Sequence, residues 1–184
     1  MATIIQFKWL VLILILLNIT ACGSNSEDNN TDTQPNPFSF SSQENAALNS
    51  ISLSNSVTVS GINTQSPINI SGGEYSVNGS NYTDTNSFVV SGDTIIVRLT
   101  SSTEFLNTTR TVLSIGAIQA TFSVTTMASD TAPNAFNFLD QNAVEQASLY
   151  VSNTIIVSGI NTSSVINVVG GEYAIDGGTY TNTA

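Results

Sequence analysis

Few side chains in this chain have the chemistry that catalysis needs. Its 184 residues include one cysteine, Cys22, and no histidine, and Lys8 is the only lysine. The commonest general base, the usual zinc ligands and every thiol except that of Cys22 are therefore missing. Serines are abundant, but none has a base that could activate it as a nucleophile. We expect no catalytic residue, no metal site, no cofactor and no enzyme activity.

Carboxylates are the remaining catalytic candidates. Glu74 and Glu172 occupy equivalent positions in two copies of a repeat, one in each copy and each beside a turn. Strand alternation places Glu74 and Ser76 outward if Tyr75 and Val77 face the core. A glycosidase needs two carboxyl groups around one glycosidic bond, so this arrangement does not predict one.

Asp32 and Asp130 are the first residues of the two copies and raise the idea of a calcium ion at the junction between repeats. Calcium takes six to eight oxygen ligands, usually several of them carboxylates. One aspartate at each junction falls short of that number. A turn or surface role is therefore favoured for both residues.

Two tyrosines, Tyr82 and Tyr180, raise the idea of a sugar-binding platform. Each can instead pair across a hairpin with Tyr75 or Tyr173, and cross-strand aromatic pairs are ordinary stabilisers of sheets. Support of the hairpin or core is the favoured interpretation.

Cys22 follows a segment that has the three parts of a secretory signal. Lys8 supplies a positive charge, the nine residues Trp9 to Leu17 are all apolar, and small residues precede the cysteine. A membrane-spanning helix needs about 20 apolar residues. The segment therefore predicts a cleaved signal peptide over residues 1–21 rather than a permanent span.

The residues Ile19-Thr20-Ala21-Cys22 resemble the lipobox of bacterial lipoproteins. The resemblance implies that Cys22 becomes the mature N-terminus and carries a thioether-linked diacylglycerol and an N-acyl chain such as palmitate. Several acyl chains anchor a protein stably, where one gives only marginal binding. Gly23, in place of an aspartate, implies the outer membrane of a two-membrane cell envelope. An ordinary signal peptide with an incidental cysteine is the alternative.

The part of the chain from Cys22 onward is strongly acidic. It has thirteen acidic residues and two basic ones, Arg98 and Arg110, which gives a net charge of −11. Such a chain repels nucleic acid and anionic headgroups, so no nucleic-acid partner is expected. Both arginines lie on predicted strands, where we expect them to pair with nearby acids. Residues 22–31 have no apolar side chain after the cysteine. This composition predicts that they form a disordered tether.

The rest of the chain is a repeat with a constant offset of 98 residues. Residues 32–86 and 130–184 share 27 identities in 55 positions. The sequence therefore predicts one domain over 32–129 and a second, truncated copy over 130–184. The second copy lacks the counterpart of 87–129, which predicts unpaired strand edges and an open apolar face.

Short alternating runs separated by turn signals predict an all-β fold. Seven or eight strands in about 98 residues are typical of an immunoglobulin-like β-sandwich, with one weak helical candidate at Asn45 to Leu48. Asn78-Gly79 and Asp176-Gly177 suit type I′ hairpin turns, and Gly116-Ala117 a turn between the last two strands. Predicted core positions are Phe38, Phe40, Tyr75, Val77, Ile95, Val97, Leu113 and Phe122.

The first copy also resembles a recurrent immunoglobulin-like module of bacterial secreted and surface proteins. The segments that carry this resemblance are 32–40, 60–63, 72–79, 92–98 and 113–126. The resemblance implies a non-catalytic surface lipoprotein, held at the membrane by Cys22, whose tandem repeats act as spacers or as adhesion and interaction modules. Two alternatives are a lectin-like surface protein that binds a glycan or protein partner, and a truncated remnant of a longer multi-repeat protein.

Overall fold

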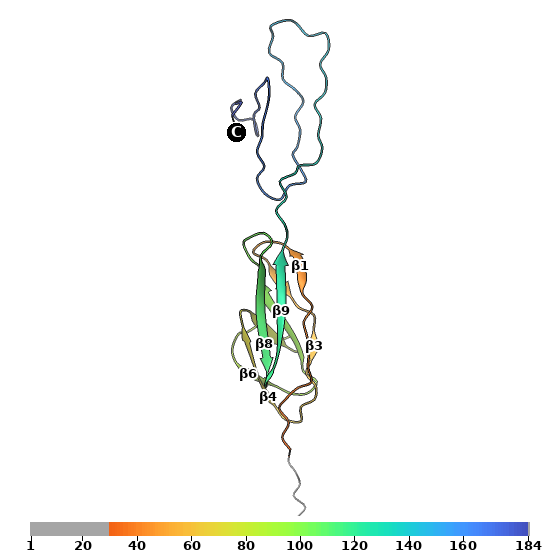
Figure 1. Cartoon of the computed structure of the whole chain (residues 1–184), viewed down its shortest axis with the longest axis vertical. Coiled ribbons are helices and arrows are strands. Elements are labelled where there is room, and N and C mark those ends of the chain that lie inside the picture. Colours follow the sequence, from red (N-terminus) through yellow and green to blue (C-terminus); the bar gives the residue numbers. More distant parts are fainter. Residues whose placement is uncertain (1–29, 184) are drawn as a thin grey trace, which may run out of the picture. The chain divides into compact units, whose positions relative to one another are not determined.

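The structure is a computed structural model that describes residues 30–183. Within this range it is all-β, with nine strands that lie between residues 43 and 126 (Figure 1). None of the described residues forms a helix long and apolar enough to cross a membrane. The strands are β1 (Gln43–Ala46), β2 (Ile51–Leu53), β3 (Val57–Thr58), β4 (Ser66–Ser71), β5 (Glu74–Val77), β6 (Ser87–Val89), β7 (Thr94–Thr100), β8 (Thr108–Ile115) and β9 (Ile118–Thr126).

The strands form two sheets that pack into a sandwich. One sheet has the order β1-β9-β8-β4-β6, and in the other β7 pairs with β2, β3 and β5. All pairs are antiparallel except β1 with β9, which is parallel. The apolar faces of both sheets meet in one core, which confirms the predicted all-β sandwich.

The core contains most of the residues that the sequence predicts for it. Tyr75, Ile95, Val97, Leu113 and Phe122 are almost completely buried. Phe40 is buried with them and Phe38 and Val77 are partly buried against the cluster. The Phe40 ring makes edge-on contacts with Phe38 and Phe122, with centroids 6.1 and 6.4 Å apart. Several members of the same core are not among the predicted positions: Val59, Ile62, Ile68, Val89, Leu99, Ile115, Ala120 and Val124.

Three predicted turns are confirmed by their backbone angles. Asn78 and Gly79 have φ values of 51° and 75°, and Asp176 and Gly177 have 46° and 73°. Two successive positive φ values are what a type I′ turn requires. Gly116, with φ of 57°, turns the chain between β8 and β9.

Three local predictions are wrong. Asn45 to Leu48 is not helical, because β1 covers its first half and Asn45 has a φ of 58°. Ser80 to Thr83 is not a strand: it contributes only an isolated bridge between Thr83 and Tyr75. Ser76 is buried rather than outward, because the loop after β5 covers it and its hydroxyl donates to Ser80 O at 2.7 Å.

The ladders of the sandwich share one property. Except for β8 with β9, every ladder joins a strand of residues 43–77 to a strand of residues 87–126. No ladder joins two strands of the N-terminal half to each other. The N-terminal half of the repeat therefore has no sheet without the C-terminal half.

The second copy of the repeat shows the consequence. Its described residues, 130–183, contain no strand and one isolated bridge, between Tyr173 and Thr181. In Figure 1 the part of the chain drawn from light to dark blue carries no arrows. Residues 130–184 correspond to the half of the first copy that makes its ladders with 87–126.

Candidate functional site

The motif Gly72-Gly73-Glu74-Tyr75, which both copies contain, lies where the chain crosses from one sheet to the other. It leaves β4, which pairs with β8, and enters β5, which pairs with β7. Gly72 has a φ of +84°, and a Cβ there would lie 2.8 Å from Arg110 O. A Cβ on Gly73 would lie 2.5 Å from Arg98 O and 2.8 Å from Thr111 Oγ1. The two glycines are needed because this corner has no room for a side chain.

Next to this corner, Glu74 and Arg98 face each other across β5 and β7. Arg98 Nε donates to Glu74 Oε2 at 2.6 Å, and the guanidinium carbon lies 4.2 Å from the centroid of the Tyr82 ring. The prediction that Arg98 pairs with an acid is confirmed. The same prediction for Arg110 is wrong, because Arg98 with Glu74 is the one ion pair among residues 30–183. Tyr82 pairs with this arginine and not, as predicted, with another tyrosine.

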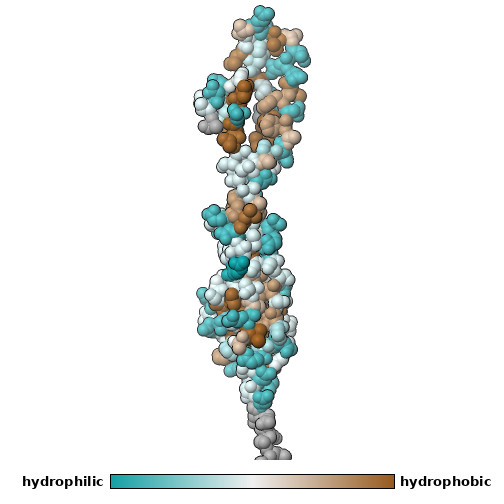
Figure 2. All heavy atoms as spheres, viewed as in Figure 1, coloured by the Kyte–Doolittle hydropathy of each residue, from teal (hydrophilic) through white to brown (hydrophobic). Residues whose placement is uncertain are grey.

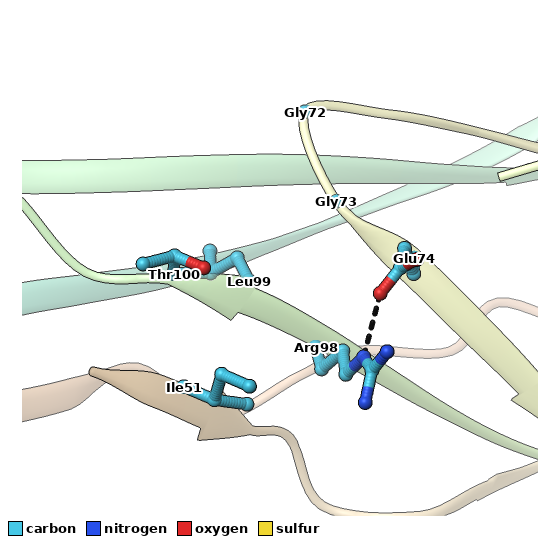
Figure 3. A pocket seen from close by; sticks show the side chains of 7 residues that line it. All are labelled: Ile51, Gly72, Gly73, Glu74, Arg98, Leu99 and Thr100. Atoms are coloured by element: carbon cyan, nitrogen blue, oxygen red, sulfur yellow. Dashed lines mark hydrogen bonds and ion pairs between the residues drawn. The ribbon is translucent and has the colours of Figure 1, made fainter. Parts of the chain in front are cut away.

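An open pocket of about 320 Å³ adjoins this ion pair (Figure 3). Its charged side chains, Glu74 and Arg98, are bound to each other, and Thr100 is the other polar residue that lines it. The Thr100 hydroxyl is the one hydroxyl or thiol among the lining side chains, and the Glu74 carboxylate is held by Arg98. The lining residues are Ile51, Gly72, Gly73, Glu74, Arg98, Leu99 and Thr100.

Tyr75 is the most buried titratable side chain near the corner, and its role is structural. Its ring is 1% exposed, and its hydroxyl donates to Thr85 O at 2.7 Å. Burial raises the pKa of the Tyr75 phenol, and a hydrogen bond with Ser87 partly offsets this. The phenol therefore stays neutral and fixes the loop after β5 against the sandwich.

Asp32 and Asp130 act as turn residues. The Asp32 carboxylate accepts a hydrogen bond from Gln34 N, and that of Asp130 accepts one from Ala132 N, each at 2.9 Å. This geometry is an Asx turn, which agrees with the favoured interpretation of both residues. Nowhere in residues 30–183 do three or more His, Cys, Asp or Glu side chains gather as metal ligands would.

The acylation site predicted at Cys22, the signal peptide and most of the tether lie outside the described residues. Tyr180, for which support of the hairpin or core was favoured over a sugar platform, is 52% exposed. No family model, no curated protein and no solved structure matches this chain.

Proposed function

We propose that the chain is a non-catalytic lipoprotein of a bacterial cell envelope, with its repeats acting as spacer and interaction modules of immunoglobulin-like type. The observation that carries the proposal is the complete lipobox, Ile19 to Cys22, directly behind a short apolar signal. Acyl chains on Cys22 anchor the protein, with the outer membrane as the expected destination. The acidic tether keeps the sandwich away from anionic headgroups.

The described residues support a non-catalytic role. The pocket beside Glu74 and Arg98 presents an ion pair whose two charged groups bind each other, with the Thr100 hydroxyl as its other polar side chain. Strands on two facing sheets, closed around one core, suit a rigid spacer, because the interior is close-packed. The part of the lectin alternative that depends on Tyr82 is weakened, since Arg98 lies over the face of that ring.

Metabolic labelling tests the anchor. Wild-type chain and the Cys22→Ser variant are expressed in a two-membrane bacterium with radiolabelled palmitate, and the envelope is separated into inner and outer membranes. We expect label in the wild type only, in the outer-membrane fraction, and a soluble or uncleaved Cys22→Ser protein. Equal label in both proteins, or none in either, would refute the lipoprotein proposal.

A glycan array separates the spacer role from the lectin alternative. Residues 23–129 contain every strand and the whole core of the part of the chain that the structure describes, so they serve as the probe. We expect no glycan to bind above background. A specific glycan signal that Tyr82→Ala abolishes, with the melting temperature unchanged, would favour the lectin.

A further inference from the structure

The pair Asn78-Gly79 is the single Asn-Gly pair in the 184 residues. An asparagine loses its side-chain ammonia most readily before glycine, because glycine has no side chain to hinder the attack of its own amide nitrogen on the asparagine Cγ. Both residues are exposed, and a Cβ built on Gly79 meets no atom within 4 Å. Figure 2 shows hydrophilic and intermediate residues over most of the visible face of the sandwich. Water therefore has access to this turn.

The backbone of this turn accepts an aspartate as well as an asparagine. Asn78-Gly79 has φ values of 51° and 75°, and the equivalent pair in the second copy, Asp176-Gly177, has 46° and 73°. In both turns the N–H of the fourth residue donates to the carbonyl of the first, at 3.0 and 2.8 Å. A carboxylate at position 78 therefore fits the turn itself, and its effect depends on what the side chain contacts.

The Asn78 side chain joins this turn to the turn between β6 and β7. Asn78 Nδ2 donates to Asp93 Oδ1 at 2.7 Å, and Asn78 Oδ1 accepts from Thr94 N at 2.8 Å. Asn78 N also donates to Thr94 O at 2.8 Å. The second oxygen of the Asp93 carboxylate accepts from Val90 N at 2.8 Å. Each polar atom of the Asn78 amide and of the Asp93 carboxylate thus has a partner, and the amide holds the two turns together.

We propose that Asn78 is a site of spontaneous deamidation, and that its contact with Asp93 controls the rate and the consequence of the reaction. Gly79 N forms a bond to Asn78 Cγ, the bond from Cγ to Nδ2 breaks, and the Gly79 amide proton leaves with the ammonia. Water then opens the succinimide at Cγ, which gives aspartate, or at the main-chain carbonyl of residue 78, which gives isoaspartate. Water is the one other reactant. The proposal does not depend on the lipid anchor or on the spacer role.

The fold slows the reaction, because the atom that leaves is held. Loss of Nδ2 as ammonia breaks its hydrogen bond to the Asp93 carboxylate. Hydrogen bonds to a charged group are among the stronger ones in proteins. Deamidation is therefore slower in the folded chain than in a chain in which this contact is absent.

The product opens the contact that Asn78 makes. Aspartate at position 78 has no N–H to donate and brings a second negative charge to hydrogen-bond distance of Asp93 Oδ1. Isoaspartate in addition lengthens the main chain of a two-residue turn, whose length fixes the register of the flanking segments. Either product therefore separates the turn after β5 from the turn between β6 and β7.

Peptide mapping by mass spectrometry measures the rate. Residues 23–184, wild type and variants, are incubated in mildly alkaline buffer at physiological temperature, and aspartate and isoaspartate at position 78 are quantified over time. Asp93→Ala should deamidate about tenfold faster than wild type, because Nδ2 loses its charged partner. Asp84→Ala, the same change in the loop after β5, is the matched control and should leave the rate unchanged.

Melting curves first establish that each variant is folded at the incubation temperature, so that global unfolding does not set the rate. Equal rates in wild type and Asp93→Ala would overturn the proposal. So would the absence of both products at position 78 in Asp93→Ala, or an equal acceleration by Asp84→Ala.

A second experiment tests the consequence and does not depend on the rate. Asn78→Asp reproduces the aspartate product and should lower the melting temperature by about 4–8 °C. The double variant Asn78→Asp, Asp93→Asn exchanges the two side chains, so an amide again faces a carboxylate and the N–H groups of Val90 and Thr94 keep their acceptors. It should recover most of the loss. An Asn78→Asp melt equal to wild type, or a double variant no more stable than Asn78→Asp, would refute the role of the contact with Asp93.

Discussion

Replacing Gly73 by alanine should destabilise the sandwich, because the methyl group would lie between the two sheets. The added Cβ would stand 2.5 Å from Arg98 O, about 0.9 Å inside the 3.4 Å at which ordinary contact begins. Overpacking of this kind costs roughly 1–3 kcal/mol. The φ of Gly73 is not in the left-handed region, so alanine can adopt this backbone conformation. Alanine also has fewer conformations than glycine in the unfolded chain, and this stabilises the folded state by about 0.4–1 kcal/mol at most. Because the clashing atom is a backbone oxygen, the overpacking cost lies in the upper part of that range, about 2–3 kcal/mol. The expected net loss in the free energy of unfolding is therefore about 1–2.5 kcal/mol.

Thermal unfolding of residues 23–184 measures this loss. For a domain of about 100 residues, each 1 kcal/mol lowers the melting temperature by roughly 4–8 °C, so a fall of about 5–20 °C is expected. Gly171→Ala is the matched control, because it makes the same change in the same sequence motif where the space is open. A Gly73→Ala melt within about 2 °C of wild type, on the same scale, would refute the argument. So would an equal fall for both variants.

Three further perturbations follow from the core and the corner. Phe122→Ala should cost about 3–5 kcal/mol in urea unfolding, because the ring is fully buried between the sheets; a loss under about 1 kcal/mol would contradict its place in the core. Glu74→Gln should cost less than about 1 kcal/mol, since the ion pair with Arg98 is partly exposed, and a larger loss in the same assay would show that the pair holds the corner. The pKa of the Tyr75 phenol is raised in the folded protein. The neutral phenol therefore contributes its full stabilisation of the fold below about pH 10, the pKa of tyrosine in the unfolded chain, and this contribution is lost as pH rises through the pKa in the folded state. Tyr75→Phe should therefore lower the melting temperature at pH 7 but flatten its decline between about pH 10 and 12, and an unchanged decline would disprove this cause.

Periodicity along the strands could be interpreted without the structure. Ile95 and Val97 alternate with polar or less buried neighbours on β7, and both are fully buried. The turn at Asn78-Gly79 was equally predictable, because few residue pairs adopt two positive φ values. The same period-two reasoning failed at Ser76, where a loop closes over the outer face of β5. Alternation describes one strand and says nothing about what covers its other side.

The partners of the charged and aromatic residues were less accessible to sequence reasoning. Tyr82 was expected beside Tyr75 because both lie near one hairpin, but Arg98 on β7 comes from 16 residues further along the chain. The Gly72-Gly73 pair was visible as a repeated motif, yet its reason is the close approach of Arg98 O and Thr111 from two different sheets. Such contacts depend on sheet topology, which local patterning leaves open.

The amino-acid sequence by itself determined the all-β class, the offset of 98 residues, the main turns and part of the core, because each of these follows from local alternation or from direct comparison of residues. Only the tertiary structure decided which strands pair. It placed every ladder partner of the strands between residues 43 and 77 in residues 87–126, since these hydrogen-bonded ladders join segments that are distant in sequence. That topology explains why the second copy keeps the loops of the first and forms no sheet within its described residues.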